Sequence, residues 1–218
     1  MAAVSATERT TAGTDAVLAV AALVAIVVLR RSTPASFGRG IWLAAFGSLL
    51  LASVLGAVAH GFTLGPGLRT AVWQPLYLAL GVTMALFVVG ALRDWRGDAA
   101  ARRALPPMLA LALVFYGITW ITGGDFLAFV VYEASALLFS LGAYLRLATV
   151  HRPGAGVMAA ALALSLVAGG IQAAGPLSVR LVWEFDHNGL FHLVQLLGLA
   201  LLVTGLRRLL SVTPTGRS

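Results

Sequence analysis

Seven long apolar stretches run through the chain, separated by short clusters of glycine, proline and arginine. A helix that crosses a membrane needs roughly 17–25 mostly apolar residues, and the stretches are of about this length. Only 11% of the residues are charged, whereas about a quarter are charged in soluble domains. We therefore predict an all-α fold, a polytopic membrane protein built as a seven-transmembrane-helix bundle, with helices at residues 15–29, 40–60, 71–92, 105–121, 126–147, 156–174 and 181–210.

The remaining polar segments are too short to bury a core of their own. Residues 1–14 are rich in alanine, threonine and serine, and we predict a disordered N-terminal tail there. They lack the basic start of a secretory signal, so we expect no removable leader. The domain organisation is thus a tail at 1–14, one transmembrane domain at 15–210 and a C-terminal tail at 211–218.

The arginines divide unequally between the two ends of the predicted helices. Loops on the cytoplasmic side of a membrane carry an excess of basic residues, so this division predicts the orientation. We place the N-terminus outside and the C-terminus in the cytoplasm, and we expect the membrane to be a bacterial inner (plasma) membrane. Three arginines lie on the outer side, Arg9, Arg69 and Arg180, and twelve on the inner side: Arg30, Arg31, Arg39, Arg93, Arg96, Arg102, Arg103, Arg146, Arg152, Arg207, Arg208 and Arg217.

Composition excludes several classes of function. The chain has no cysteine, so it forms no disulfide and no thiolate metal site. Every basic residue other than histidine is arginine, so the lysine needed for a retinal Schiff base is absent. The net charge is +7, but the arginines are scattered at helix ends rather than gathered on one surface. We therefore expect a lipid bilayer as the partner, and no nucleic acid; the oligomeric state stays open.

With this orientation, most of the unusual polar side chains fall in the outer half of the bundle. Ionisable residues are costly inside a membrane and are usually functional there. Glu133 lies eight residues after Asp125, about 12 Å into its helix at ~1.5 Å per residue. Asn188, His192 and Gln195 share one helix face at ~100° per residue. The predicted polar pocket comprises Gln74, Tyr116, Gln172, Asn188 and Gln195.

The histidines among these residues predict a zinc site. His60, His187 and His192 would provide three nitrogen ligands and leave one position open, as in catalytic zinc sites. Glu133 or Asp186 would then act as general base or orient a ligand. Two structural interpretations compete with this one. In the first, the polar groups only join helices by hydrogen bonds. In the second, Asp186 caps a helix while His187 lies among the lipid headgroups.

This arrangement resembles the superfamily of alkaline ceramidases, progestin/adiponectin receptors and related seven-helix membrane hydrolases. In that superfamily a histidine on the second helix and an H-x-x-x-H pair on the seventh hold zinc, and a serine precedes the first histidine. His60 is similar to the histidine of the second helix and His192 to the second of the pair. Asn188 stands at the first position of the pair, and the nearest serine before His60 is Ser53, with Gly56 at the position one turn before it.

Three functions follow as expectations. The first is a zinc-dependent hydrolase of a lipid amide or ester, in which Ser53, Glu133 and Asp186 are the catalytic candidates and the substrate enters from the outer leaflet. The second is a non-enzymatic sensor, small-molecule binder or partner subunit with a polar pocket at its outer end. The third is a haem protein with His60 and His192 as axial ligands.

Overall fold

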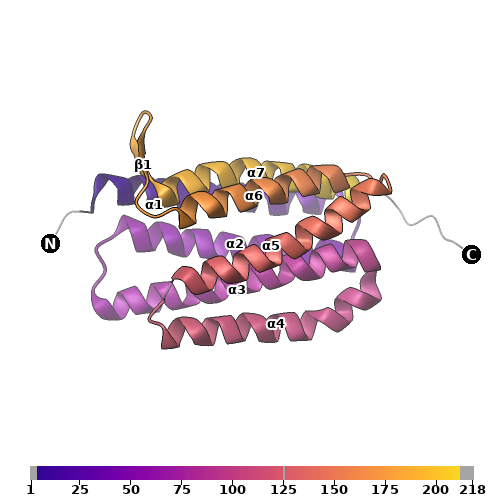
Figure 1. Cartoon of the computed structure of the whole chain (residues 1–218), viewed down its shortest axis with the longest axis horizontal. Helices are drawn as coiled ribbons and strands as arrows, with labels where there is room; N and C mark the ends of the chain where they lie inside the picture. The colour runs from indigo at the N-terminus through magenta and orange to yellow at the C-terminus, as the bar shows by residue number, and fades with distance from the viewer. Residues whose placement is uncertain (1–3, 125, 212–218) are drawn as a thin grey trace, which may run out of the picture.

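A computed structural model describes residues 4–124 and 126–211 and confirms the predicted bundle (Figure 1). Within these residues there are seven helices, and each is long and apolar enough to cross a membrane. Two short strands form a hairpin before the last helix. The elements are α1 Ala6–Ser32, α2 Phe37–Gly61, α3 Pro66–Arg96, α4 Asp98–Ile121, α5 Phe126–Thr149, α6 Ala155–Ala173, β1 Ser178–Arg180, β2 Glu184–Asp186 and α7 His187–Leu210.

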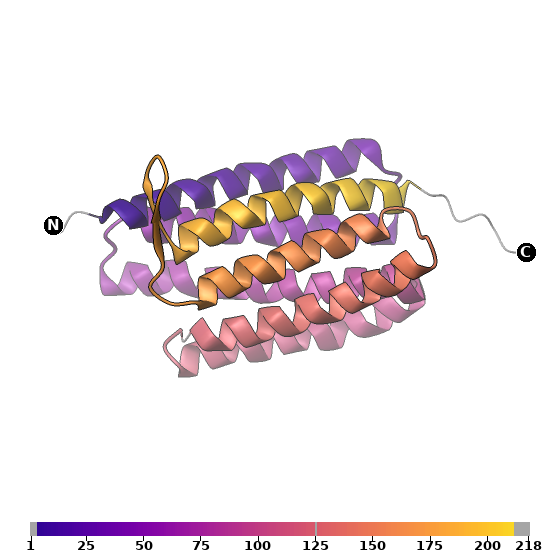
Figure 2. The same ribbon diagram turned by 45° about the horizontal axis from the view of Figure 1, so that its top comes forward.

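Six of the helices form a closed ring, and α4 lies outside it. Around the ring, α1 packs on α2, α2 on α3, α3 on α5, α5 on α6, α6 on α7, and α7 again on α1. Helix α4 packs almost entirely on α3 and barely touches α5, at the edge of the bundle (Figures 1 and 2). Its outward face is apolar, as expected of a surface that contacts lipid, and Ile121 is 87% exposed.

Small residues allow the helices to approach closely. Lipid tails are as apolar as leucine, so helices in a membrane associate largely through close packing rather than through the hydrophobic effect. Gly90 on α3 faces the fully buried ring of Trp42 on α2, and a Cβ at Gly90 would lie 2.6 Å from that ring. Trp42 also meets Phe87 edge to face. These contacts hold α2 against α3 near the end of the bundle that we predict to be cytoplasmic.

A buried ionic network ties three helices together at the same end. Nη1 of Arg93 lies 3.0 Å from Oδ1 of Asp94, and Nε of Arg93 donates to Asp98 at the start of α4. The hydroxyl of Tyr144 on α5 donates to Oδ2 of Asp94 at 2.7 Å. The Asp94 carboxylate thereby has both a cation and a neutral donor, which a buried charge requires. The network joins α3 to α4 and to α5.

Several predicted boundaries differ from the structure, α4 for example beginning at Asp98 and not at residue 105, and two of the corrections bear on the site. Helix α1 begins at Ala6, capped by Ser5, whose hydroxyl accepts from the backbone N–H of Glu8 at 3.1 Å. Residues 6–14 are therefore the first turns of a helix and not a disordered tail. Of the predicted C-terminal tail only Ser211 is described, and Asp125 also lies outside the described residues.

The second correction concerns residues 181–186, which we predicted as helical. Strands β1 and β2 pair antiparallel, with Val179 opposite Phe185, and α7 starts only at His187. Valine and aromatic residues favour strands, and the Asp186 side chain stops the helix from extending backwards because it caps the N-terminus of α7. The hairpin projects from the same end of the bundle as the N-terminus (Figure 1). Its apolar tip, residues 181–183, is exposed.

Candidate functional site

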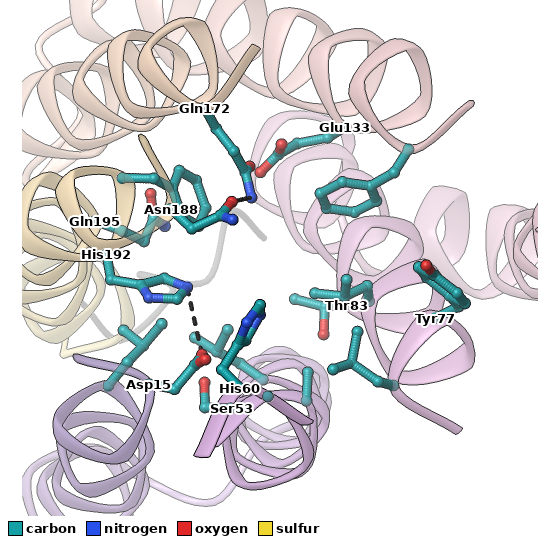
Figure 3. Close-up of a pocket in the computed structure, with 18 of the residues that line it drawn as sticks. Asp15, Ser53, His60, Tyr77, Thr83, Glu133, Gln172, Asn188, His192 and Gln195 are labelled. Carbon is teal, nitrogen blue, oxygen red and sulfur yellow. Dashed lines mark hydrogen bonds and ion pairs between the residues drawn. The ribbon is translucent and has the colours of Figure 1, made fainter. Parts of the chain in front are cut away.

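A polar cavity of about 160 Å³ lies inside the ring of six helices, toward the end that carries the N-terminus and the hairpin. Every helix of the ring contributes to its wall, and α4 does not. Aromatic and aliphatic side chains complete the lining, so the polar groups converge within an apolar shell. Figure 3 shows the polar side chains that line it: Asp15, Ser53, His60, Tyr77, Thr83, Glu133, Gln172, Asn188, His192 and Gln195.

Asp15 and His192 meet across the interface between α1 and α7. Oδ1 of Asp15 lies 3.3 Å from Nε2 of His192, and the two residues are only 5% and 7% exposed (Figure 3). The other ring nitrogen, Nδ1, lies 2.9 Å from the hydroxyl of Thr14. That hydroxyl donates its single hydrogen to the carbonyl oxygen of Thr11, so it must accept from Nδ1–H of His192. In the neutral ring Nε2 then carries no hydrogen, so it is an acceptor, and it faces a carboxylate.

Two acceptors that face each other need a proton or a metal ion between them. A charge-assisted N–H···O bond is typically 2.7–2.9 Å long, shorter than the observed 3.3 Å. Two ligands of one tetrahedral zinc, each 2.0–2.1 Å from the ion, lie about 3.3 Å apart. In addition, Oδ2 of Asp15 is buried and has no hydrogen-bond partner within the described residues. The two atoms therefore have the spacing of two metal ligands, and the second oxygen of Asp15 has no partner among the described residues.

Gly56 on α2 makes room for the Asp15 carboxyl group. A Cβ at this position would lie 2.7 Å from Oδ2 of Asp15, closer than real side chains approach. Ser53, one turn earlier on the same helix, also lines the cavity and is 3% exposed. The glycine thus stands where a side chain would displace the acid from the cavity.

His60 stands between the cavity and an open vestibule. Its Nδ1 lies 2.7 Å from Oε2 of Glu8, which is 45% exposed. The ring meets Trp73 edge to face. Both residues line the inner cavity and also an outer hollow of about 480 Å³, which we call the vestibule. The Glu8 carboxylate accepts from Nδ1–H, so Nε2 of His60 is the free nitrogen. A carboxylate on one ring nitrogen is the usual companion of a histidine that ligates a metal through the other.

The opposite wall of the cavity is rich in unpaired acceptors. Glu133 on α5 is 6% exposed, and no hydrogen bond or ion pair to its carboxyl group is found within residues 4–124 and 126–211. The Oε1 atoms of Gln172 and Gln195 are buried without a partner in the same described part. Nε2 of Gln172 donates to Oδ1 of Asn188 at 3.1 Å, which links α6 to α7. Buried acceptors of this kind are expensive unless a ligand, an ion or water satisfies them.

A third hollow, of about 670 Å³, opens outside the ring between α1, α7 and the hairpin. Its lining is mostly apolar and includes Val17, Trp183 and Leu193, with Arg9 near the end of the bundle. Thr14 lines this groove while its hydroxyl bonds His192, which lines the inner cavity. The Thr14–His192 contact therefore separates the outer groove from the cavity.

The structure brings most of the predicted site residues together. Two predicted pocket residues lie elsewhere: Gln74 is not among the described residues that line this cavity, and Tyr116 lies on the peripheral helix α4, where it packs against Trp120. The predicted residues that do line the cavity are Ser53, His60, Glu133, Gln172, Asn188, His192 and Gln195.

At the start of α7, Asp186 and His187 lie as the structural interpretation predicts, with Asp186 as a helix cap and His187 outside the cavity. Asp186 caps the helix: its Oδ1 accepts from the backbone N–H of Gly189 at 2.9 Å and from the Thr11 hydroxyl at 2.8 Å. His187 is the first residue of α7 and does not line the cavity. Its ring cannot join His192 because five residues separate them, which is about 140° around a helix.

The predicted three-histidine zinc set therefore does not fit. Across the described residues, no three His, Cys, Asp or Glu side chains lie close enough together to hold a metal as they stand. A different donor set fits in part. Asp15 and His192 have ligand spacing, and His60 lines the same cavity with its Nε2 free. Two imidazoles and a carboxylate are a common donor set for catalytic zinc.

Sequence reasoning missed Asp15, Glu8 and Thr14. In the sequence Asp15 is the first residue of a predicted span, and Glu8 and Thr14 lie in the predicted tail. Asp15 carries a signal, since an acid at the start of an apolar helix, like Glu133 within one, indicates a functional site. Its partner does not follow from the sequence, because the pairing depends on α1 beginning at Ala6 and packing beside α7.

The comparisons with known proteins place the chain in a family without assigning a function. Residues 10–211 match the family of unknown function DUF6962, and the chain belongs to that family. No curated protein and no solved structure matches it. The match begins within α1 and ends after α7, so it covers the whole bundle, including Asp15 and both cavity histidines.

Proposed function

We propose that this membrane protein is a zinc-dependent hydrolase of a lipid amide or ester, with Asp15 and His192 as metal ligands and His60 as the third. The observation that carries the proposal is the 3.3 Å contact between two buried acceptors, Oδ1 of Asp15 and Nε2 of His192. The proposal replaces His187 by Asp15 in the donor set. It keeps the relation to the alkaline ceramidase and progestin/adiponectin receptor superfamily as a hypothesis.

The residues around the two histidines support ligation through Nε2 in both. Thr14 accepts from Nδ1–H of His192, and Glu8 accepts from Nδ1–H of His60. Such contacts fix the tautomer and the ring orientation of a ligating histidine, and their loss typically weakens metal binding 10–100-fold. When bound, zinc would supply Lewis acidity toward a substrate carbonyl. The hydroxyl of Ser53 lies near Asp15 and His60 (Figure 3), and in this proposal it donates to that carbonyl oxygen.

In this proposal the lipid substrate lies in the groove outside the ring. The groove between α1, α7 and the hairpin is mostly apolar, suits an acyl chain, and is separated from His192 by the Thr14 side chain. Arg9 in the same groove suits a phosphate or carboxylate at the headgroup level. The arginine distribution supports an outward-facing cavity in a bacterial inner membrane, so we propose entry from the outer leaflet.

Metal content tests the proposal directly. We expect protein purified in detergent, or reconstituted with zinc and dialysed, to contain about one zinc per chain by elemental analysis. Asp15→Asn and His192→Gln should each lose the metal, and both should abolish hydrolysis of fluorogenic long-chain amides and esters. His187→Gln is the matched control and should keep both. Zinc-free wild-type protein after reconstitution, or metal retained in both variants, would overturn the proposal.

One observation favours a second candidate, a non-enzymatic binder of a small molecule. The cavity volume of about 160 Å³ is below the roughly 300–1,000 Å³ of pockets for drug-sized ligands, so only a small polar molecule or ion fits wholly inside. The same volume argues against a haem between His60 and His192. Binding without turnover, in protein that contains no metal, would favour this candidate.

A further inference from the structure

Three helices of the ring each bring an unpaired acceptor to the cavity. Glu133, Oε1 of Gln172 and Oε1 of Gln195 are all without a partner in the part of the chain that the structure describes. Figure 3 shows Glu133 and Gln172 on one side of the cavity, across from Asp15 and Ser53. They come from α5, α6 and α7, three helices that pack in sequence around the ring.

An ionised Glu133 requires a partner that brings positive charge as well as hydrogens. Among the described residues that line the cavity, the two histidines are the only basic ones, and each has a carboxylate beside it: Glu8 for His60 and Asp15 for His192. Glu133 has none, although a buried carboxylate needs a cation or a proton. Gly169 on α6 adjoins Glu133, since a Cβ there would be in ordinary contact with Oε2 of Glu133 at 3.6 Å.

We infer that Glu133, Gln172 and Gln195 form a subsite for the primary ammonium group of a small amine. A primary ammonium carries one charge and three N–H donors, which matches one carboxylate and two amide oxygens. A quaternary ammonium carries the charge without donors, and an alcohol carries a donor without the charge. Both should therefore bind less well.

If the proposed hydrolase function holds, the subsite also narrows the substrate to an N-acyl derivative of a small primary amine. Water cleaves the C–N bond of the amide, the acyl carbon gains the oxygen, and the amine leaves with the protons as an ammonium ion. Glu133, which we had predicted as a general base, then binds that product. This substrate assignment rests on the proposed function, whereas binding of the amine does not.

The test uses the full-length protein in detergent with zinc removed by a chelator, so that amine binding is measured apart from the metal. The probes are ethanolamine, ethylene glycol, which replaces the ammonium by a hydroxyl, and choline, which replaces its hydrogens by methyl groups. We expect ethanolamine to raise the melting temperature and to bind by calorimetry, and the other two to bind at least about tenfold more weakly.

The variants locate the site. Glu133→Gln keeps the volume and should weaken ethanolamine binding at least about tenfold, whereas Asp15→Asn should leave it within about twofold. Equal binding of ethanolamine and ethylene glycol would overturn the inference. It would also be overturned if Asp15→Asn lost ethanolamine binding while Glu133→Gln kept it. If Glu133→Gln does not fold, Gln172→Leu and Gln195→Leu test the same prediction through the two amides. Loss of zinc in Asp15→Asn with ethanolamine binding retained separates the two proposals.

Discussion

Gly56 of α2 and Asp15 of α1 are in direct contact, and a Cβ at Gly56 would lie 2.7 Å from the Asp15 carboxyl group. The contact joins the first two helices at the point where the acid enters the cavity. It also explains why glycine stands one turn before His60 on α2. The polar group at that place comes from Asp15 of α1.

Gly56→Ala should therefore damage the site more than the fold. The added methyl group must push the Asp15 carboxyl away from His192, and overpacking of this kind typically costs 1–3 kcal/mol. We expect zinc binding to fall at least about tenfold. Gly47→Ala on the same helix is the control, because nothing lies within 4 Å of a Cβ there. Equal zinc content in both variants would contradict the prediction.

Thr14→Val should weaken metal binding without removing a ligand. Valine has nearly the same shape but cannot accept from Nδ1–H of His192, so the ring loses the contact that orients it. We expect a 10–100-fold weaker zinc affinity, measured by competition with a chelator. Thr204→Val on α7 is the control, since its hydroxyl bonds only the carbonyl oxygen of Ala200. An unchanged affinity in Thr14→Val would show that the tautomer argument is wrong.

The Glu8–His60 pair should restrict access from the vestibule to the cavity. The chain has no cysteine, so a single Ser53→Cys reports on the cavity alone. We expect a charged methanethiosulfonate reagent to label this cysteine slowly, and faster by about tenfold when Glu8→Gln weakens the ion pair.

Two comparisons make that labelling experiment decisive. Thr63→Cys lies in the vestibule and should react quickly whether or not Glu8 is changed. Reagent added only to the outside of oriented vesicles should label both cysteines, which tests the proposed outward orientation. If Ser53→Cys reacts at the same rate with and without Glu8→Gln, the pair does not gate the cavity.

Tyr144→Phe should destabilise the far end of the bundle and leave the site intact. The substitution removes the 2.7 Å hydrogen bond to Asp94 and leaves a buried carboxylate oxygen unsatisfied, which typically costs 1–3 kcal/mol. We expect a lower melting temperature with unchanged zinc content. Tyr116→Phe on the peripheral helix α4 should change neither quantity.

The number and positions of the spans followed from the sequence because the membrane imposes a length and an apolar composition on each helix. Clustering of polar residues was also visible, since any buried ionisable group stands out in such a chain. Glu133, His60 and His192 were found this way, and all three line the cavity. The boundaries at Ala6 and His187 were not found, because polar residues at helix ends give no such signal.

By itself, then, the sequence determined seven helices, the unequal division of arginines and most of the polar residues of the cavity. Only the tertiary structure decided which carboxylate pairs with which histidine. The order of helices around the ring, with α4 outside and α1 closing against α7, brings Asp15 to His192 and Glu8 to His60. Such pairings join residues up to 177 positions apart, from 15 to 192, and no local periodicity encodes them. They depend on packing between helices, where small residues such as Gly56 set how closely two helices approach.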